Sequence, residues 1–238
     1  MLPARRHDIS RLEAFSDAAF AFALTLLVVS LDVPKSYDGL MRTMSGFPSF
    51  ACCFALLVWI WHEHNMFFRR YGLQDAWTVF LNGLLLFVVL FYVYPLKFMF
   101  DSMFAMFSSP GSSPVVPMTF SQLWRASALY GLGFVVLFTM FALLYRHAYN
   151  KRDELMLTPL EIFDVKMYAG HHLVSVMVGV VAMVAALALP SWLAFLSPMC
   201  FALMGPGHYL FGVRIEKRRS ALAQRLEPAV LLQPRSVE

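Results

Sequence analysis

Six long apolar stretches constrain this chain more than any other feature of its sequence. They cover residues 14–33, 47–68, 76–96, 126–145, 171–189 and 192–211. The hydrocarbon core of a bilayer is about 30 Å thick, and about 20 apolar residues cross it as a helix. Each stretch therefore predicts one transmembrane helix, and together they predict an all-α integral membrane protein with six spans.

The composition excludes several classes of protein. The chain is 59% hydrophobic and only 14% charged, and 23 of its 238 residues are Phe. Soluble domains are about 25% charged, and a water-exposed surface does not accommodate so many large apolar side chains. A soluble globule, a disordered chain and a nucleic-acid-binding domain are excluded, so no nucleic acid is expected as a partner despite a net charge of +4.

The Lys and Arg residues predict how the spans are oriented. With the N-terminus inside, 4 of the 19 fall in outside segments and the other 15 inside, which is the bias of cytoplasmic segments. The outside residues are Lys35, Arg42, Lys97 and Arg125. Both termini are therefore expected to be cytoplasmic. The basic run from Arg214 to Arg219 is either an interfacial anchor or a site for anionic membrane lipids.

The chain is expected to form one six-span transmembrane domain over residues 1–219 and a cytoplasmic tail over residues 220–238. The tail is either a short amphipathic helix ending near Pro228 or disordered. Residues 108–114, which are rich in Ser, Pro and Gly, predict an exposed turn on the outside.

The first span carries an unusual pattern. Ser10 and Glu13 have the spacing of a capping box, which predicts where the helix begins. Apolar side chains then repeat every seven residues and fall on one narrow stripe. These residues, called the heptad stripe below, are Phe15, Ala19, Phe22, Leu26, Val29 and Val33. Small residues flank the stripe and let other helices approach closely: Ala14, Ala18, Ala21 and Ala23.

The heptad stripe has two interpretations. It either packs within the helical bundle of its own subunit, or it joins identical first helices about a symmetry axis. In the second case rings of Phe22, Leu26 and Val29 line an axial pore, and such apolar constrictions gate by dewetting. Thr25 lies at the edge of the stripe, where its hydroxyl either faces the lumen or bonds a preceding carbonyl of its own helix.

Asp17 lies well inside the first apolar stretch, where a carboxylate is costly and marks a functional hypothesis. It points about 140° away from Phe22 on a helix of 3.6 residues per turn, so its partners are expected within the subunit. Ser16, Arg11 and the polar end of the second span are candidates, and His64 is the natural one. A structural network is favoured over a proton relay, because the later spans offer no further acid.

No set of side chains predicts catalysis or a metal site. His62, Glu63 and His64 do not converge on one face of a helix, and the three cysteines lack metal-ligand spacing. No nucleophile with its base is apparent. Neither enzymatic activity nor a cofactor is expected.

Two groups of residues carry a resemblance to a known family. They are Arg11-x-x-x-Phe15-Ser16-Asp17 with Ala23-x-Thr25-Leu26-Leu27 in the first span, and Trp61-x-x-His64 in the second. Both resemble the transmembrane protein 175 family of potassium channels, specifically over about residues 8–70. The single six-span repeat is similar to prokaryotic members, which form homotetramers, and this implies a bacterial-type plasma membrane.

The resemblance implies roles for individual residues. The first helix of each of four subunits lines a central pore, and the constriction falls on Phe22, Leu26 and Val29. The layer linked to potassium preference falls on Thr25. Relatives usually carry Ile or Leu at the narrowest layer, where this chain has Phe22. The residues that hold the pore helix in place are Arg11, Phe15, Ser16, Asp17, Trp61 and His64.

The resemblance thus implies a potassium-permeable cation channel, weakly to moderately selective for K⁺ over Na⁺, with K⁺ as the permeant ion. The sequence has no TVGYG-like filter, so selectivity cannot come from a cage of carbonyls. Two other functions stay open: a proton-permeable or proton-coupled membrane transporter, and a non-conducting membrane scaffold. The expected partners are membrane lipids and other copies of the chain, in a homotetramer.

Overall fold

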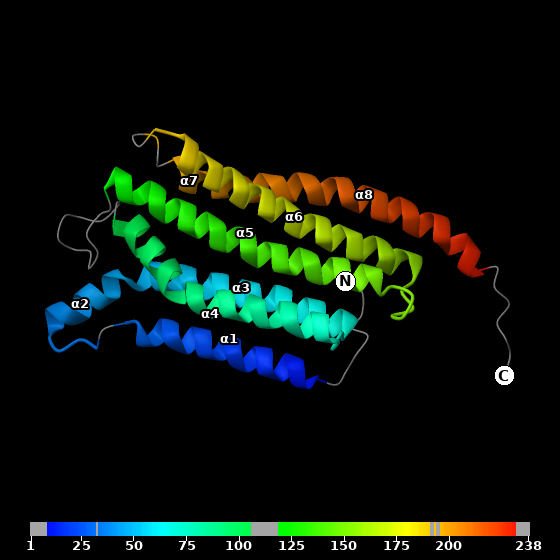
Figure 1. Cartoon of the computed structure of the whole chain (residues 1–238), viewed down its shortest axis with the longest axis horizontal. Helices are drawn as coiled ribbons and strands as arrows, with labels where there is room; N and C mark the ends of the chain where they lie inside the picture. The colour runs from blue at the N-terminus through cyan, green and yellow to red at the C-terminus, as the bar shows by residue number, and fades with distance from the viewer. Residues whose placement is uncertain (1–8, 32, 106–118, 191–192, 194–195, 232–238) are drawn as a thin grey trace.

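The computed structural model describes residues 9–31, 33–105, 119–190, 193 and 196–231, and within these residues the regular structure is entirely helical. The elements in order are α1 (Arg11–Val29), α2 (Tyr37–Ser45), α3 (Phe47–Tyr71), α4 (Ala76–Ala105), α5 (Phe120–Asn150), α6 (Pro159–Ala188), α7 (Leu196–Met199), the 3₁₀ turn η2 (Cys200–Leu203) and α8 (Met204–Leu231). The long helices lie side by side, with α1 at one edge and α8 at the other (Figure 1). The prediction of an all-α protein is confirmed.

The described helices give fewer membrane spans than the six expected. Helices α1, α4, α5 and α6 are each long and apolar enough to cross a membrane, and α2 with α3 forms a fifth candidate if this pair, bent by 45°, is one span. The last expected span is not one continuous helix, because residues 196–211 are divided among α7, η2 and the start of α8. Helix α8 also carries the basic run from Arg214 to Arg219 at its middle, and charged residues are costly inside a membrane. The count of six spans therefore stays a prediction.

Helix α1 begins as predicted and ends earlier. The Ser10 amide donates to Glu13 Oε2 at 2.7 Å, and the Glu13 amide donates to Ser10 Oγ at 3.1 Å. The expectation that the span continues to Val33 is wrong, because α1 ends at Val29 and Ser30 caps it. Pro34 disfavours helical backbone at Val33, the residue before it, so the helix does not extend that far.

Helix α4 runs past Pro95 to Ala105, nine residues beyond the expected end of the third span. A proline inside a helix removes one backbone hydrogen bond and destabilises the helix. Other contacts that hold the helix can offset this loss. Here Lys97 Nζ pairs with Asp101 Oδ2 at 2.7 Å, and Asp101 also accepts a hydrogen bond from Ser49 of α3. These contacts stabilise the last turns of α4.

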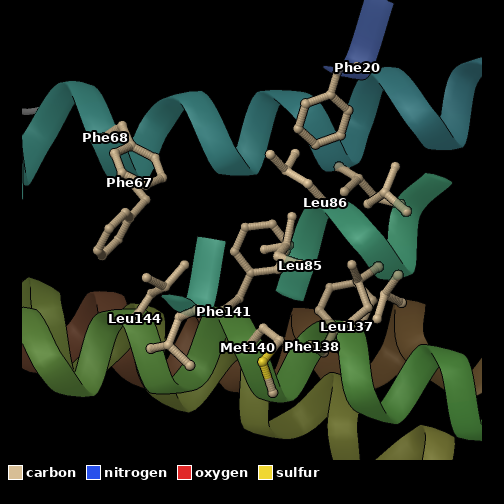
Figure 2. Close-up of a cluster of buried hydrophobic side chains, with 14 of the residues drawn as sticks. Phe20, Phe67, Phe68, Leu85, Leu86, Leu137, Phe138, Met140, Phe141 and Leu144 are labelled. Carbon is tan, nitrogen blue, oxygen red and sulfur yellow. The ribbon is translucent and has the colours of Figure 1, made fainter. Parts of the chain in front are cut away.

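The core is a continuous cluster of large apolar side chains from α1, α3, α4 and α5, part of which is shown in Figure 2. Its labelled members are Phe20, Phe67, Phe68, Leu85, Leu86, Leu137, Phe138, Met140, Phe141 and Leu144. Helices α4 and α5 come especially close at Gly133, where a Cβ would lie 2.1 Å from the Tyr92 ring. Any larger residue at this position would force the Tyr92 ring to move, and the Tyr92 hydroxyl donates to the carbonyl of Leu129 at 3.0 Å.

Acidic residues join the helices at the end of the bundle where α3 and α5 finish. Asp75, just before α4, lies 2.9 Å from His147 Nε2 of α5 and accepts hydrogen bonds from Thr78. Burial by itself raises the pKa of Asp75, but the hydrogen bonds from His147 and Thr78 outweigh it and lower that pKa to about 2. Asp75 is therefore ionised at neutral pH and serves as the cap of α4.

A buried carboxylate on α6 connects three helices at the same end. The Asp164 side chain is 2% exposed and accepts from Arg219 Nε of α8 at 2.8 Å and from Arg70 Nη2 of α3 at 3.3 Å. Charge-assisted hydrogen bonds of this kind are strong, and two cations satisfy both carboxylate oxygens. Asp164 thereby holds the end of α3 and the middle of α8 against α6.

The expected domain boundary at residue 219 falls inside α8, which continues without a break from Met204 to Leu231. The segment from Ser220 onward is helical, but it is a continuation of α8 that passes Pro228 and reaches Leu231 and not a short helix ending near Pro228. The turn predicted over residues 108–114 lies outside the described residues.

Asp164→Asn is expected to destabilise the protein by roughly 2 kcal/mol, because it leaves two arginines without their shared counter-charge in a partly buried site. The melting midpoint of the detergent-solubilised protein measures this. Asp153→Asn is the matched control, since the Asp153 side chain is 86% exposed and such surface pairs contribute little. Equal shifts for the two variants would contradict the role assigned to Asp164.

Candidate functional site

One side of α1 packs against the rest of the chain. Its buried residues are Ser16, Phe20, Ala23 and Leu27, whose spacing places them on one helix face. This face contacts α3 and α4, and the Phe20 ring lies edge-on to the His64 ring of α3 with centroids 5.5 Å apart. The packing determines which side of α1 is left uncovered.

Most of the heptad stripe lies on the uncovered side. Phe15, Phe22 and Val29 are 64%, 56% and 68% exposed, and at about 100° per residue the stripe is centred about 110° from the buried face. Only Ala19 and Leu26 are half-buried against the core. Packing within the chain is one of the two interpretations of the stripe. It applies only to these two residues, which are the smaller part of the stripe.

Small residues and Thr25 share the uncovered side. Ala14, Ala18 and Ala21 are exposed, whereas Ala23 is fully buried within the chain. Thr25 is exposed, and its hydroxyl donates to the Ala21 carbonyl at 2.9 Å, which is the second of the two geometries expected for it. A threonine oxygen that donates in this way keeps its lone pairs as acceptors, so Thr25 still presents an oxygen to the surface of α1.

A buried hydrogen-bonded network holds the covered side of α1. Asn82 of α4 donates through Nδ2 to Ser16 Oγ at 2.9 Å, and its Oδ1 lies 2.7 Å from His64 Nε2 of α3. Ser16 in turn donates to the Leu12 carbonyl at 2.8 Å. The side chains of Ser16, His64 and Asn82 are at most 1% exposed. Since an amide oxygen only accepts, His64 donates from Nε2 in this arrangement.

Asp17 binds a different partner from the one expected. Trp61 Nε1 of α3 donates to Asp17 Oδ1 at 2.7 Å, so the polar end of the second span does supply the partner, but His64 is not that residue. Consecutive residues on a helix point about 100° apart, so Ser16 and Asp17 face different neighbours. Ser16 reaches the Asn82–His64 pair, and Asp17 reaches Trp61.

The structure unites four of the six residues expected to support the pore helix. Ser16, Asp17, Trp61 and His64 all make the contacts described above, whereas Arg11 and Phe15 are exposed on α1 and join no part of this network. Sequence reasoning missed Asn82, which links α1, α3 and α4. The available signal was a single amide in an otherwise apolar span, since a polar group at that depth needs partners.

Asn82→Leu is expected to lower the stability of the protein by about 1–3 kcal/mol, because Ser16 and His64 lose a partner in a buried site. Thermal unfolding in detergent measures this loss. Asn65→Leu on α3 is the matched control, because Asn65 is half-buried and makes no side-chain hydrogen bond to the described residues. A loss no greater than that of the control would show that the network does not stabilise α1.

Comparison with known proteins places this geometry in a family. Residues 11–92, which hold α1, α3 and the Asn82 network, match the family described as endosomal/lysosomal potassium channel TMEM175. A protein of Marivirga tractuosa named as a potassium channel is 36% identical over 227 residues, which cover 90% of this chain and 91% of the relative. A potassium channel of Chamaesiphon minutus is 27% identical over 51% of this chain and 66% of its own length.

Two solved structures are similar over nearly their whole length. One is the crystal structure of a threonine-to-alanine variant of the potassium channel MtTMEM175 with a nanobody–MBP fusion protein, at 34% identity and a TM-score of 0.80, covering 90% of this chain and 97% of that one. The other is a lysosomal potassium-selective channel TMEM175 homologue from Chamaesiphon minutus, at 26% identity and a TM-score of 0.52, covering 86% and 96%. With this similarity in sequence and fold, the chain belongs to the TMEM175 family.

Proposed function

We propose that this chain is one subunit of a potassium-permeable cation channel, in which the α1 helices of four copies surround a central pore. The observation that carries the proposal is the uncovered heptad stripe, because α1 lies at the edge of the subunit (Figure 1) with Phe22 and Val29 facing outward. A helix at an edge is placed to meet its symmetry mates. The relatives named as potassium channels support the choice of ion.

The stripe supplies a hydrophobic constriction. Rings of Phe22, Leu26 and Val29 from four subunits form successive apolar layers, and a narrow apolar passage gates by dewetting. An ion that passes must shed part of its water, and K⁺ does so at a lower cost than Na⁺. The channel is therefore weakly to moderately selective for K⁺, and the exposed Thr25 oxygen offers an acceptor next to the constriction.

The Asn82 network sets the rotation of α1 about its own axis. Rotating the helix by one residue would break both the Ser16–Asn82 and the Asp17–Trp61 hydrogen bonds, and unpaired polar groups are costly in a membrane interior. The same rotation would move Phe22 about 100°. The network thus positions the constriction without touching the ion.

The ends of the helices support the orientation inferred from charge. Arg11 at the start of α1, Arg70 at the end of α3 and Lys151 at the end of α5 belong to the same end of an alternating bundle (Figure 1). Cytoplasmic ends carry such basic residues. We place this end, and both termini, on the cytoplasmic side of a bacterial-type plasma membrane.

Phe22→Ala is expected to raise K⁺ flux several-fold in liposomes that contain the purified protein, and to reduce the preference for K⁺ over Na⁺. The physical reason is that a methyl group in place of each phenyl ring widens the constriction and lets water enter. Flux is measured with a K⁺-sensitive dye under a set K⁺ gradient, and again with Na⁺.

Phe87→Ala on α4 is the matched control, since Phe87 is 64% exposed and Phe22 is 56% exposed, yet only Phe22 lies on α1. The control is expected to conduct like the wild type. Absence of K⁺ flux from all three proteins would overturn the channel and leave a non-conducting scaffold. Proton flux without K⁺ flux would instead indicate a proton-permeable protein.

Val29→Cys is expected to cross-link between subunits under mild oxidation, because four copies of this position would meet near the axis. The experiment uses a background in which Cys52, Cys53 and Cys200 are replaced, and gel electrophoresis without reductant reports the product. Val184→Cys on α6 is the control, since Val184 is 52% exposed on another helix. Cross-linking at position 184 but not at 29 would rule out a shared α1 axis.

A further inference from the structure

The basic run of α8 is divided by the fold into two groups with different partners. Arg219 faces α6, where it is paired with the buried carboxylate of Asp164 at 2.8 Å. Arg214, Lys217 and Arg218 are exposed on α8 and form no ion pair with any of the described residues. Arg219 thus has a structural role, and the three neighbouring cations are available to a ligand.

The three free cations continue an apolar face of the same helix. Positions separated by three, four, seven or eight residues share one side of an α-helix. The residues on this side, called the α8 outer face below, are Leu210, Arg214, Lys217, Arg218, Ala221 and Arg225. Leu210 is 56% exposed, and Val213, at the edge of this face, is 41% exposed. The face is therefore apolar at its start and cationic beyond Val213.

This order matches the layers of a membrane. At 1.5 Å per residue, Leu210 and Lys217 are about 10 Å apart along the axis, which is similar to the step from the outer acyl carbons to the headgroup layer. The depth is set independently, because Asp164 ties Arg219 to Arg70 at the end of α3. The exposed cations therefore lie at about the level of the end of α3.

The surface beside these cations is open and only slightly concave. A shallow groove on α8 is lined by Val213, Glu216, Lys217, Ser220, Ala221 and Gln224. It offers an apolar wall near Val213, hydroxyl and amide groups near Ser220 and Gln224, and the ammonium of Lys217 between them. Glu216 lies at the far edge from the outer face, so the cationic side of the groove is the one that continues into Arg214 and Arg218.

We propose that the α8 outer face binds an anionic phospholipid, with the headgroup phosphate on Arg214, Lys217 and Arg218 and an acyl chain along Leu210 and Val213. Guanidinium groups bind phosphate oxygens through paired hydrogen bonds, and lysine adds a compact charge. An anchor held by charge alone would need no exposed apolar side chains beside the cations. The combination on one face distinguishes a lipid site from a general attraction to the membrane surface.

Titration of the delipidated full-length protein with phosphatidylglycerol or phosphatidylcholine, followed by native mass spectrometry, tests this site without reference to ion conduction. The wild type is expected to bind phosphatidylglycerol in preference. The triple variant Arg214→Gln/Lys217→Gln/Arg218→Gln is expected to bind it about a hundredfold more weakly, since three interfacial cations at on the order of 1 kcal/mol each amount to about two powers of ten in affinity. Phosphatidylcholine binding should not change.

The matched control removes three exposed cations elsewhere at the same end of the bundle: Arg69→Gln/Arg146→Gln/Lys166→Gln. It is expected to bind phosphatidylglycerol like the wild type. An equal loss in both variants would overturn the site in favour of general electrostatics, and so would the absence of any preference in the wild type. Displacement of phosphatidylglycerol by inorganic phosphate would overturn the lipid site, because it would show that the cations bind a phosphate group without the acyl chain. Melting midpoints within a degree or two of wild type confirm that all variants are folded.

Discussion

The structure depends on one constraint, which is that a polar group in the hydrocarbon of a membrane must find its partner inside the protein. Asn82 meets this constraint for three helices at once, because its amide donates to Ser16 of α1 and its oxygen pairs with His64 of α3. The bond to Ser16 does not survive a rotation of α1, and neither does the bond from Trp61 to Asp17, so these contacts determine which side of that helix is covered. The uncovered side is then the one that carries Phe22 and Val29.

The same logic explains where the protein meets its surroundings. Contacts that are complete within the chain, such as Asp17 with Trp61 or Asp164 with Arg219, contribute to folding and orientation. Groups that the chain leaves uncovered mark the two surfaces proposed for partners. On α1 these are bulky apolar side chains, suited to copies of the same helix, and on α8 they are cations beside an apolar face, suited to an anionic lipid.

Much of the local structure is predictable because it rests on residues close together in the sequence. The start of α1 follows from the Ser10–Glu13 capping box, and the need of Asp17 for a partner follows from its depth. The errors concern where helices end, which depends on local helix breakers and on contacts from distant residues as well as on apolar composition. Helix α4 continues nine residues past its expected end, where Asp101 is held by Lys97 and by Ser49 of α3. The last apolar stretch contains Pro198 and Gly205-Pro206-Gly207, and it is divided among α7, η2 and α8.

The sequence by itself determined that this chain belongs in lipid, and that one helix carries an apolar stripe repeating every seven residues. Both are periodic or compositional properties that need no knowledge of neighbours. Only the tertiary structure decided which side of α1 faces inward, because its covered and uncovered sides are both apolar and periodicity cannot separate them. It also decided that Asp17 meets Trp61 while His64 meets Asn82. That choice depends on how three helices are rotated against one another, and only their packing sets those angles.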